Sequence, residues 1–399
     1  MRSVRTLHSV FAWLPLTQPW LARLVADAPE PRILALVRDG APRDPRLVAL
    51  TDGIPVVGLL GAAYQHLAGR AWPLRGDRRF GAVYARLVAA AARDLGPHDV
   101  VHAHFGDQGY RSRLVRAPLV VSFYGHDYTL ARDPWWAAAY REVFAAARLV
   151  VAEAPHAASR LCDLGCPPAK VRIHPLGVDF ARINFRPRFP RMPIEVLFVG
   201  RFEDKKGLPD ALEAVARAGP GFRLTVIGDG PAAPALKAHA ARLGLDVAWR
   251  GLLPHQAVRE ALDRADLLIA PSRTAASGDT EGGLPIVVVE ALAAGLPVLA
   301  TRHADLPWAV EDGRTGRLVP ERDPAALAAA LQGMAAHPER WPIMGALGRA
   351  AVLARHDARR QPGRLRALYE EATAGKPCAT PTTTSGRSGN SGTLGNTNV

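Results

Sequence analysis

Short runs of β-branched and leucine residues alternate with alanine-rich stretches along most of the chain, and this alternation is the feature that most constrains its fold. A short apolar run fits a strand buried on both faces, and the longer alanine-rich stretches fit connecting helices. The alternation therefore predicts repeated βαβ units, which build parallel sheets covered by helices. In the first half we predict strands at 32–37, 100–103, 119–123, 149–152 and 171–174, and helices at 81–95 and 135–147.

A stretch rich in proline and arginine, residues 185–193, interrupts the alternation and is typical of a linker. The second half then repeats the scheme, with predicted strands at 195–200, 224–227, 267–270 and 298–301 and predicted helices at 208–218 and 231–243. The sequence predicts an α/β chain of two Rossmann-like, doubly wound domains that face each other across a cleft. In such sheets ligands bind outside the carboxyl ends of the strands.

Length and composition agree with two domains, because 399 residues of which 48% are hydrophobic can bury a large core. We assign residues 1–185 to the first domain and 186–350 to the second. We expect 351–375 to form a C-terminal helix that packs back toward the first domain. Residues 376–399 are rich in threonine, serine, glycine and asparagine, and we expect a disordered tail there.

The cysteines and the apolar runs indicate the cell compartment. Three cysteines are too few for a disulfide framework, and Cys162 and Cys166 have no second pair to complete a zinc site. No apolar run approaches the roughly 20 residues that span a bilayer, and the first ten residues lack the pattern of a secretion signal. We therefore expect a cytoplasmic protein.

The formal net charge of +13 predicts anionic partners. No zinc-finger spacing, helix-turn-helix pattern or aromatic ribonucleoprotein motif accompanies the arginines, so we expect no nucleic-acid partner. The stretch 65–80 combines Arg70, Arg75, Arg78 and Arg79 with Trp72 and Phe80. It is either a patch that binds an anionic membrane surface, at the inner face of the membrane, or an ordinary solvated face.

Two loops that follow predicted strands carry the pattern of an anion site. The first, 200–208, reads Gly-Arg-Phe-Glu-Asp-Lys-Lys-Gly-Leu, and a helix begins near its end. The free amides of that helix, with Arg201 and Lys206, can hold a diphosphate. The second, 228–231, reads Gly-Asp-Gly-Pro, and its glycines let the backbone approach a ligand closely.

A third segment, 278–298, brackets a glycine pair, Gly282 and Gly283, with Glu281 and Glu290. The glycines present bare amides, and a carboxylate accepts two hydroxyls at once, which suits a ribose diol. The β-branched run 286–289 favours a strand by propensity, whereas Gly295 as a helix stop favours a helix.

Together these residues resemble glycosyltransferase family 4, whose members have the GT-B fold and retain the anomeric configuration. The resemblance covers roughly residues 100–331 and rests on the three motifs occurring in this order. It implies an acceptor-side first domain and a second domain that binds a nucleotide-diphosphate sugar, a UDP- or GDP-sugar. It implies no cofactor and no metal, and an acceptor that is a glycan or a lipid-linked glycan.

The resemblance also assigns roles to residues. It implies that Arg201 and Lys206 bind the donor diphosphate and stabilise the departing nucleotide, so that two cations replace a metal ion. It implies that Glu290 holds the ribose and that Glu281 lies by the donor sugar. The remaining donor-binding residues that it implies are Gly200, Gly228, Gly230, Gly282, Gly283 and Leu284.

One spacing departs from the family. Members usually place seven residues between the two glutamates, whereas Glu281 and Glu290 enclose eight. Either the loop bulges by one residue and Glu281 still reaches the sugar, or the amides of Gly282 and Gly283 contact the sugar without it.

Three histidines of the first domain, His102, His104 and His126, follow or lie in its predicted strands. His104 matches the family position beside the transferred sugar, and His126 occupies the neighbouring loop, so each is predicted to donate to a sugar hydroxyl or to orient the acceptor. A buried core histidine is the alternative for both. We interpret His102 as structural, because we expect it to alternate away from the cleft along its strand.

The family's amino-terminal glycine pair is missing before residue 40. The segment 11–20 there resembles a subgroup of surface-polysaccharide, colanic-acid-type transferases, in which a polar turn replaces the glycines. We expect Thr17 and Gln18 to contact the acceptor. The implied reaction is a front-face displacement with retention. Two alternatives are a dinucleotide-dependent oxidoreductase, which rests on Gly228, Gly230 and Ala233, and a catalytically silent sugar-nucleotide or glycan-binding protein.

Overall fold

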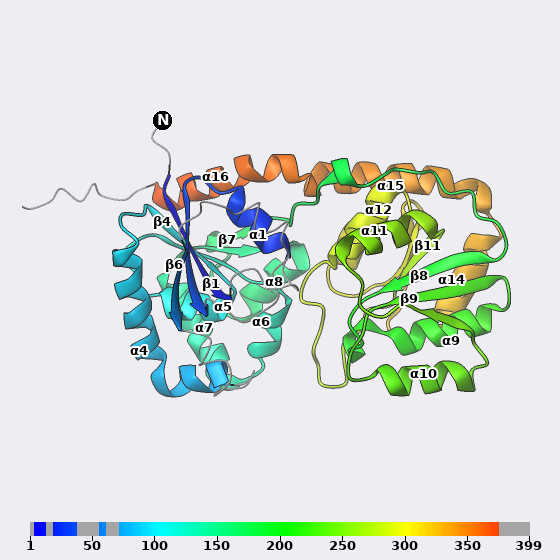
Figure 1. Cartoon of the computed structure of the whole chain (residues 1–399), viewed down its shortest axis with the longest axis horizontal. Helices are drawn as coiled ribbons and strands as arrows, with labels where there is room; N and C mark the ends of the chain where they lie inside the picture. Colours follow the sequence, from blue (N-terminus) through cyan, green and yellow to red (C-terminus); the bar gives the residue numbers. More distant parts are fainter. Residues whose placement is uncertain (1–3, 13–18, 38–55, 61–71, 375–399) are drawn as a thin grey trace, which may run out of the picture.

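The computed structural model describes residues 4–12, 19–37, 56–60 and 72–374. Figure 1 shows two α/β domains side by side, joined along one side by two consecutive helices at the C-terminal end of the described chain. Each domain contains one sheet whose neighbouring strands pair in parallel. The prediction of two Rossmann-like domains is confirmed.

The first domain has a seven-stranded sheet of order β3-β2-β1-β4-β5-β6-β7. Its elements are β1 (Thr6–Ala12), α1 (Pro19–Ala26), β2 (Pro31–Val37), β3 (Val56–Leu60), α4 (Trp72–Asp94), β4 (Val100–His104), α5 (Gly106–Ser112), β5 (Leu119–Ser122), α6 (Gly125–Leu130), α7 (Pro134–Ala146), β6 (Ala147–Ala152), α8 (Pro155–Asp163) and β7 (Val171–Ile173). Helices α4, α5 and α7 pack on one face of this sheet. Helix α1 and the C-terminal helix α16 (Gln361–Thr373) pack on the other.

The second domain has a six-stranded sheet of order β10-β9-β8-β11-β12-β13. Its elements are β8 (Ile194–Val199), α9 (Leu208–Ala218), β9 (Phe222–Ile227), α10 (Ala233–Arg242), β10 (Val247–Trp249), α11 (His255–Arg264), β11 (Leu267–Ala270), α12 (Ile286–Ala294), β12 (Val298–Thr301), α13 (Leu306–Ala309), β13 (Gly316–Val319), α14 (Pro324–Ala335) and α15 (Trp341–His356). Helices α9, α10 and α14 cover one face, and α11, α12, α13 and α15 cover the other.

Both sheets reverse their strand order at one point, between β1 and β4 in the first and between β8 and β11 in the second. Such a switch point opens a crevice at the carboxyl ends of the strands. The loops after β8 and β11 flank the switch point of the second sheet, and they carry two of the three predicted motifs.

The chain crosses between the domains twice, and Val178, which precedes the first crossing, contacts the second. The segment 185–193 leads from the first sheet into β8. The return lies between α15 and α16, where the Val178 amide donates to the His356 carbonyl at 2.7 Å and the Ala358 amide donates to the Val178 carbonyl at 3.0 Å. The predicted helix at 351–375 is thus two helices, because Asp357 caps a short 3-10 turn that interrupts it.

Two predicted elements differ from the structure. Helix α4 begins at Trp72 rather than at Gly81. Gly81 lies inside the helix, where an added Cβ would come within 2.7 Å of the Tyr110 ring, so this glycine permits close packing. Residues 286–289 belong to helix α12, not to a strand, and Gly295 ends that helix at φ 83°. Packing in the core overrides the β-branched propensity of this run.

Candidate active site

The two glycine loops of the second domain lie side by side at the ends of β8 and β9. The Phe202 amide donates to the Asp229 carbonyl at 2.9 Å. An added Cβ at Gly228 would collide with the Gly200 carbonyl, and one at Gly230 would come within 2.9 Å of the Phe202 carbonyl. The glycines at 228 and 230 therefore allow the close approach of two loops to each other.

Lys206 lies at the centre of this group of loops. Its Nζ is 2.7 Å from Oε2 of Glu281, and the two side chains are 18% and 6% exposed. The second oxygen of Glu281 accepts from the Ser272 hydroxyl at 2.7 Å. Burial alone raises the pKa of the Glu281 carboxyl, but the Lys206 ammonium and the Ser272 hydroxyl bring it below its ordinary value. The structure thus brings two predicted donor residues, 75 positions apart, into one buried ion pair.

Arg201 belongs to the loop 200–208, but its side chain points to solvent. It is 63% exposed, and its guanidinium lies 2.8 Å from the Glu203 carboxylate. One nitrogen of the guanidinium contacts Glu203, and the exposed remainder of the group can still donate to an anion.

Glu290, at the middle of α12, is paired with a histidine that the sequence did not single out. Oε1 of Glu290 lies 2.5 Å from Nε2 of His255, the first residue of α11, and the two side chains are 5% and 49% exposed. His255 begins α11 after Pro254, and five residues separate it from the end of β10, so its place in the loop region after a strand is the signal that was available. The pair combines a buried carboxylate with an exposed imidazole.

The glycine pair between the glutamates touches the first domain. Gly282 has φ 66°, and an added Cβ there would come within 2.6 Å of the Gly125 Cα. An added Cβ at Gly283 would collide with the Glu153 carboxylate, and one at Gly125 would collide with the Glu281 carbonyl. The neighbouring Leu284 is buried in the core of the second domain.

Two polar contacts also join this loop and its surroundings to the first domain. Asp279 accepts a hydrogen bond from the Thr129 hydroxyl and lies 2.9 Å from the Lys205 Nζ. Asp305, which is 1% exposed, accepts from the amides of His156 at 2.7 Å and Ala157 at 3.1 Å, at the first turn of α8. The second domain thus caps a helix of the first.

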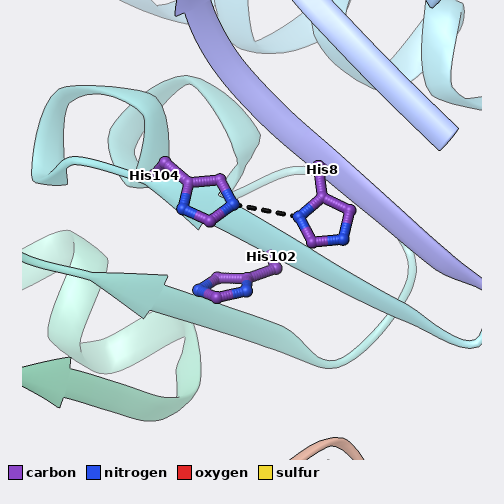
Figure 2. Close-up of side chains that lie close together, drawn as sticks. All are labelled: His8, His102 and His104. Carbon is purple, nitrogen blue, oxygen red and sulfur yellow. Dashed lines mark hydrogen bonds between the residues drawn. The ribbon is translucent and has the colours of Figure 1, made fainter. Parts of the chain in front are cut away.

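His104 belongs to a buried histidine cluster, His8, His102 and His104, which Figure 2 shows on β1 and β4. Nδ1 of His8 lies 2.9 Å from Nε2 of His104. Nδ1 of His104 lies 3.1 Å from the Tyr124 hydroxyl, and the imidazole is 0% exposed. Both ring nitrogens of His104 therefore have protein partners.

Alternation along the strand, from which we expected His102 to turn away from the cleft, does not separate it from His104. Residues two apart on a strand share a face, and the two rings lie 4.2 Å apart between centroids. His102 contacts the hydroxyls of Tyr369 at 2.8 Å and Ser122 at 2.7 Å, so it ties β4 to β5 and α16. This hydrogen bonding agrees with a structural role.

Burial keeps the histidine cluster neutral. It lowers the pKa of His8 to about 3, and burial followed by the neighbouring histidines holds the pKa of His102 and His104 well below the ordinary value. Neutral imidazoles are also metal ligands, and one nitrogen from each ring lies within 4.8 Å of the others. Five of the six ring nitrogens, however, already contact each other or hydroxyl groups.

Several predicted residues lie outside the described part of the chain. The backbone of His126 is in α6, but its side chain is not described. Thr17, Gln18 and residues 65–71 lie outside the described residues, and only the backbone of residues 72–80 is described. Among the described residues, no helix is both long and apolar enough to cross a membrane.

Family models cover both domains. The model described as Glycosyltransferase Family 4 matches residues 22–182, and the model described as Glycosyl transferases group 1 matches residues 193–337. The putative colanic acid biosynthesis glycosyltransferase WcaL of Salmonella typhimurium is 35% identical over 247 residues, which cover 58% of this chain and 60% of that protein. The GDP-mannose-dependent alpha-(1-6)-phosphatidylinositol monomannoside mannosyltransferase of Mycolicibacterium smegmatis is 30% identical over 71% of this chain and 79% of that protein.

Solved structures show the same arrangement of domains. Sucrose-phosphate synthase from Thermosynechococcus elongatus has a TM-score of 0.74 at 17% identity, over 93% of this chain and 100% of that one. Anabaena HepE, solved in complex with UDP-glucose, has a TM-score of 0.69 at 17% identity, over 92% and 99%. These likenesses concern the fold. With the family models and the curated relatives, they establish that the chain belongs to glycosyltransferase family 4 and has the GT-B fold.

Proposed function

We propose that this chain is a retaining glycosyltransferase that moves a hexose from a nucleotide-diphosphate sugar to a glycan or lipid-linked acceptor. The observation that carries the proposal is the buried Lys206–Glu281 pair, held at the switch point of the second sheet beside two glycine loops. A lysine there is a cation for the diphosphate, and the adjoining carboxylate and glycine amides suit a sugar.

In this proposal Lys206 exchanges part of its contact with Glu281 for the diphosphate, and Arg201 leaves Glu203 to join it. Two preorganised cations then stabilise the negative charge that develops on the leaving nucleotide, without a metal ion. The Glu290 carboxylate, oriented by His255, receives the ribose hydroxyls. The acceptor hydroxyl attacks on the face of the leaving group, and the departing phosphate oxygen accepts its proton.

The histidines of the first domain keep their predicted roles in a more specific form. His104 has no exposed surface, so we propose that it acts through the Tyr124 hydroxyl, which contacts its Nδ1. His126 remains the candidate for direct contact with the sugar or acceptor.

Relatives suggest the biological setting and the donor. One is described as a colanic acid transferase and another as GDP-mannose-dependent, and HepE was solved with UDP-glucose. We therefore propose surface polysaccharide or glycoconjugate synthesis from a UDP- or GDP-sugar. The net charge of +13 supports work at the inner, anionic membrane surface.

The test is nucleotide release from a panel of uridine, guanosine and adenosine diphosphate sugars by the wild type, Lys206→Ala and Glu290→Ala. Release with one donor that both variants lose supports the proposal. Binding of a donor with no release, even when membrane extract supplies acceptors, would instead identify a catalytically silent sugar-nucleotide binding protein.

A further inference from the structure

Glu153 lies in the interface between the domains, opposite the glycine pair. It is the first residue after β6, at the carboxyl end of that strand. Its Oε2 lies so close to Gly283 that an added Cβ there would collide with it. Its side chain is partly buried, and the sequence motifs gave no reason to select it.

The carboxyl group of Glu153 has no hydrogen-bond or ion-pair partner among the described residues. Two other carboxyls nearby are satisfied: Asp127 accepts from two backbone amides of its own domain, and Asp305 accepts from two amides of α8. A partly buried carboxyl without a partner is costly, and such exceptions need an explanation. The free carboxyl therefore indicates a ligand that the described residues do not supply.

The surroundings select the chemistry of that ligand. Burial, followed by the charges of Asp305 and Asp127, raises the pKa of Glu153 to about 8. A phosphate would add negative charge to a group of carboxyls, whereas a neutral hydroxyl can both donate to and accept from Glu153.

The position selects which hydroxyl. Gly283 is two residues from Glu281, whose carboxylate is 2.7 Å from Lys206 Nζ. In a nucleotide sugar the hexose is bonded directly to the terminal phosphate, so a diphosphate on Lys206 brings its hexose to this end of the loop. A group that faces Gly283 from the first domain is then beside the hexose.

We propose that Glu153 binds a hydroxyl of the transferred sugar, so that the first domain contributes to donor-sugar recognition. The proposal rests on the proposed function, because it takes the diphosphate to bind at Lys206. It makes Glu153 a sugar-binding residue, with no contact to the nucleotide.

The experiment is calorimetric titration of the full chain with UDP, GDP, UDP-glucose and GDP-mannose, without acceptor. Glu153→Ala should weaken binding of the sugar nucleotide about tenfold, which is the effect of losing one hydrogen bond to a carboxyl group. Binding of the matching nucleoside diphosphate should change less than twofold. Glu153→Gln keeps one donor and one acceptor and should lose less than the alanine variant. Glu142→Ala, which removes an exposed carboxylate of the same domain, is the matched control.

The outcomes separate the two claims. Suppose that the wild type binds sugar nucleotides. If Glu153→Ala weakens the binding of the sugar nucleotide and of the nucleoside diphosphate equally, or weakens the binding of neither, the role of Glu153 is refuted and the proposed function stands. If the wild type binds no nucleotide or sugar nucleotide, the proposed function fails and this inference fails with it. The melting temperature of each variant is measured as well, so that a folding defect can be distinguished from a loss of binding.

Discussion

The Lys206–Glu281 pair allows ligand binding to be separated from stability. Lys206→Ala leaves a carboxylate that is 6% exposed with one neutral donor, the Ser272 hydroxyl. Removal of one partner from a buried ion pair costs about 3–5 kcal/mol. Because Lys206 itself is 18% exposed, we expect the lower end, about 3 kcal/mol of unfolding free energy.

This loss should depend on pH with a defined sign. In the wild type the pKa of Glu281 is lowered, so its contribution is present above the ordinary pKa and is lost on acidification. Without Lys206, burial dominates and the pKa of Glu281 rises above its ordinary value. Its penalty then grows as pH rises, by up to about 1.4 kcal/mol per pH unit until the new pKa is passed. Lys206→Ala should therefore lose more stability at pH 8 than at pH 5.

The assay is urea unfolding of the wild type, Lys206→Ala, Glu281→Gln and the double variant at both pH values, beside nucleotide release. A loss of about 3 kcal/mol corresponds to a melting temperature lower by roughly 6–12 °C for a domain of this size. The double variant should regain most of the stability and no activity. A loss below about 1 kcal/mol with no pH dependence, or a double variant that releases nucleotide, would refute the reasoning.

Three further outcomes are expected. Gly125→Ala should lower nucleotide release at least tenfold, because its methyl group would collide with the Glu281 carbonyl and keep the domains apart. The control is Gly333→Ala, at a helical position with open space around it, which should leave release unchanged. His174 is buried and its pKa is lowered to about 4, so the wild type loses stability as the pH falls below 6.5. His174→Leu lacks this group, so its stability relative to the wild type should rise by about 3 kcal/mol between pH 6.5 and 4. A difference in urea midpoints that stays constant over this pH range would contradict the prediction. Treatment with EDTA should leave nucleotide release unchanged, since two cationic side chains are proposed to replace a metal ion. Loss of release that zinc restores would contradict this, and metal analysis of variants of the histidine cluster would then test that cluster as the metal site.

The sheets were predictable because parallel strands leave a strong local signal. Strands buried on both faces read as apolar runs, and the runs at 100–103, 267–270 and 298–301 each correspond to a strand of the structure. Helix α12 was ambiguous for the same reason. Its β-branched residues favour a strand locally, and burial on all sides removes the amphipathic period that would have indicated a helix.

The pairing of site residues was less predictable, because it depends on contacts between distant segments. Motif spacing placed Lys206 and Glu281 on loops at the same edge of one sheet, but not in one ion pair. Glu153 and His255 carry no local motif. Each became recognisable only when the structure placed it against Gly283 or Glu290.

The additional residue between the glutamates shows how the two domains constrain one another. An extra residue in a loop is easiest to place where the backbone can turn left-handed, and Gly282 has φ 66°. The bend brings Gly282 against the Cα of Gly125, so a side chain at either position would obstruct the contact. Glycines in both domains therefore permit this close contact. It leaves the Glu281 carboxylate free to reach Lys206, while its own carbonyl lies against the first domain.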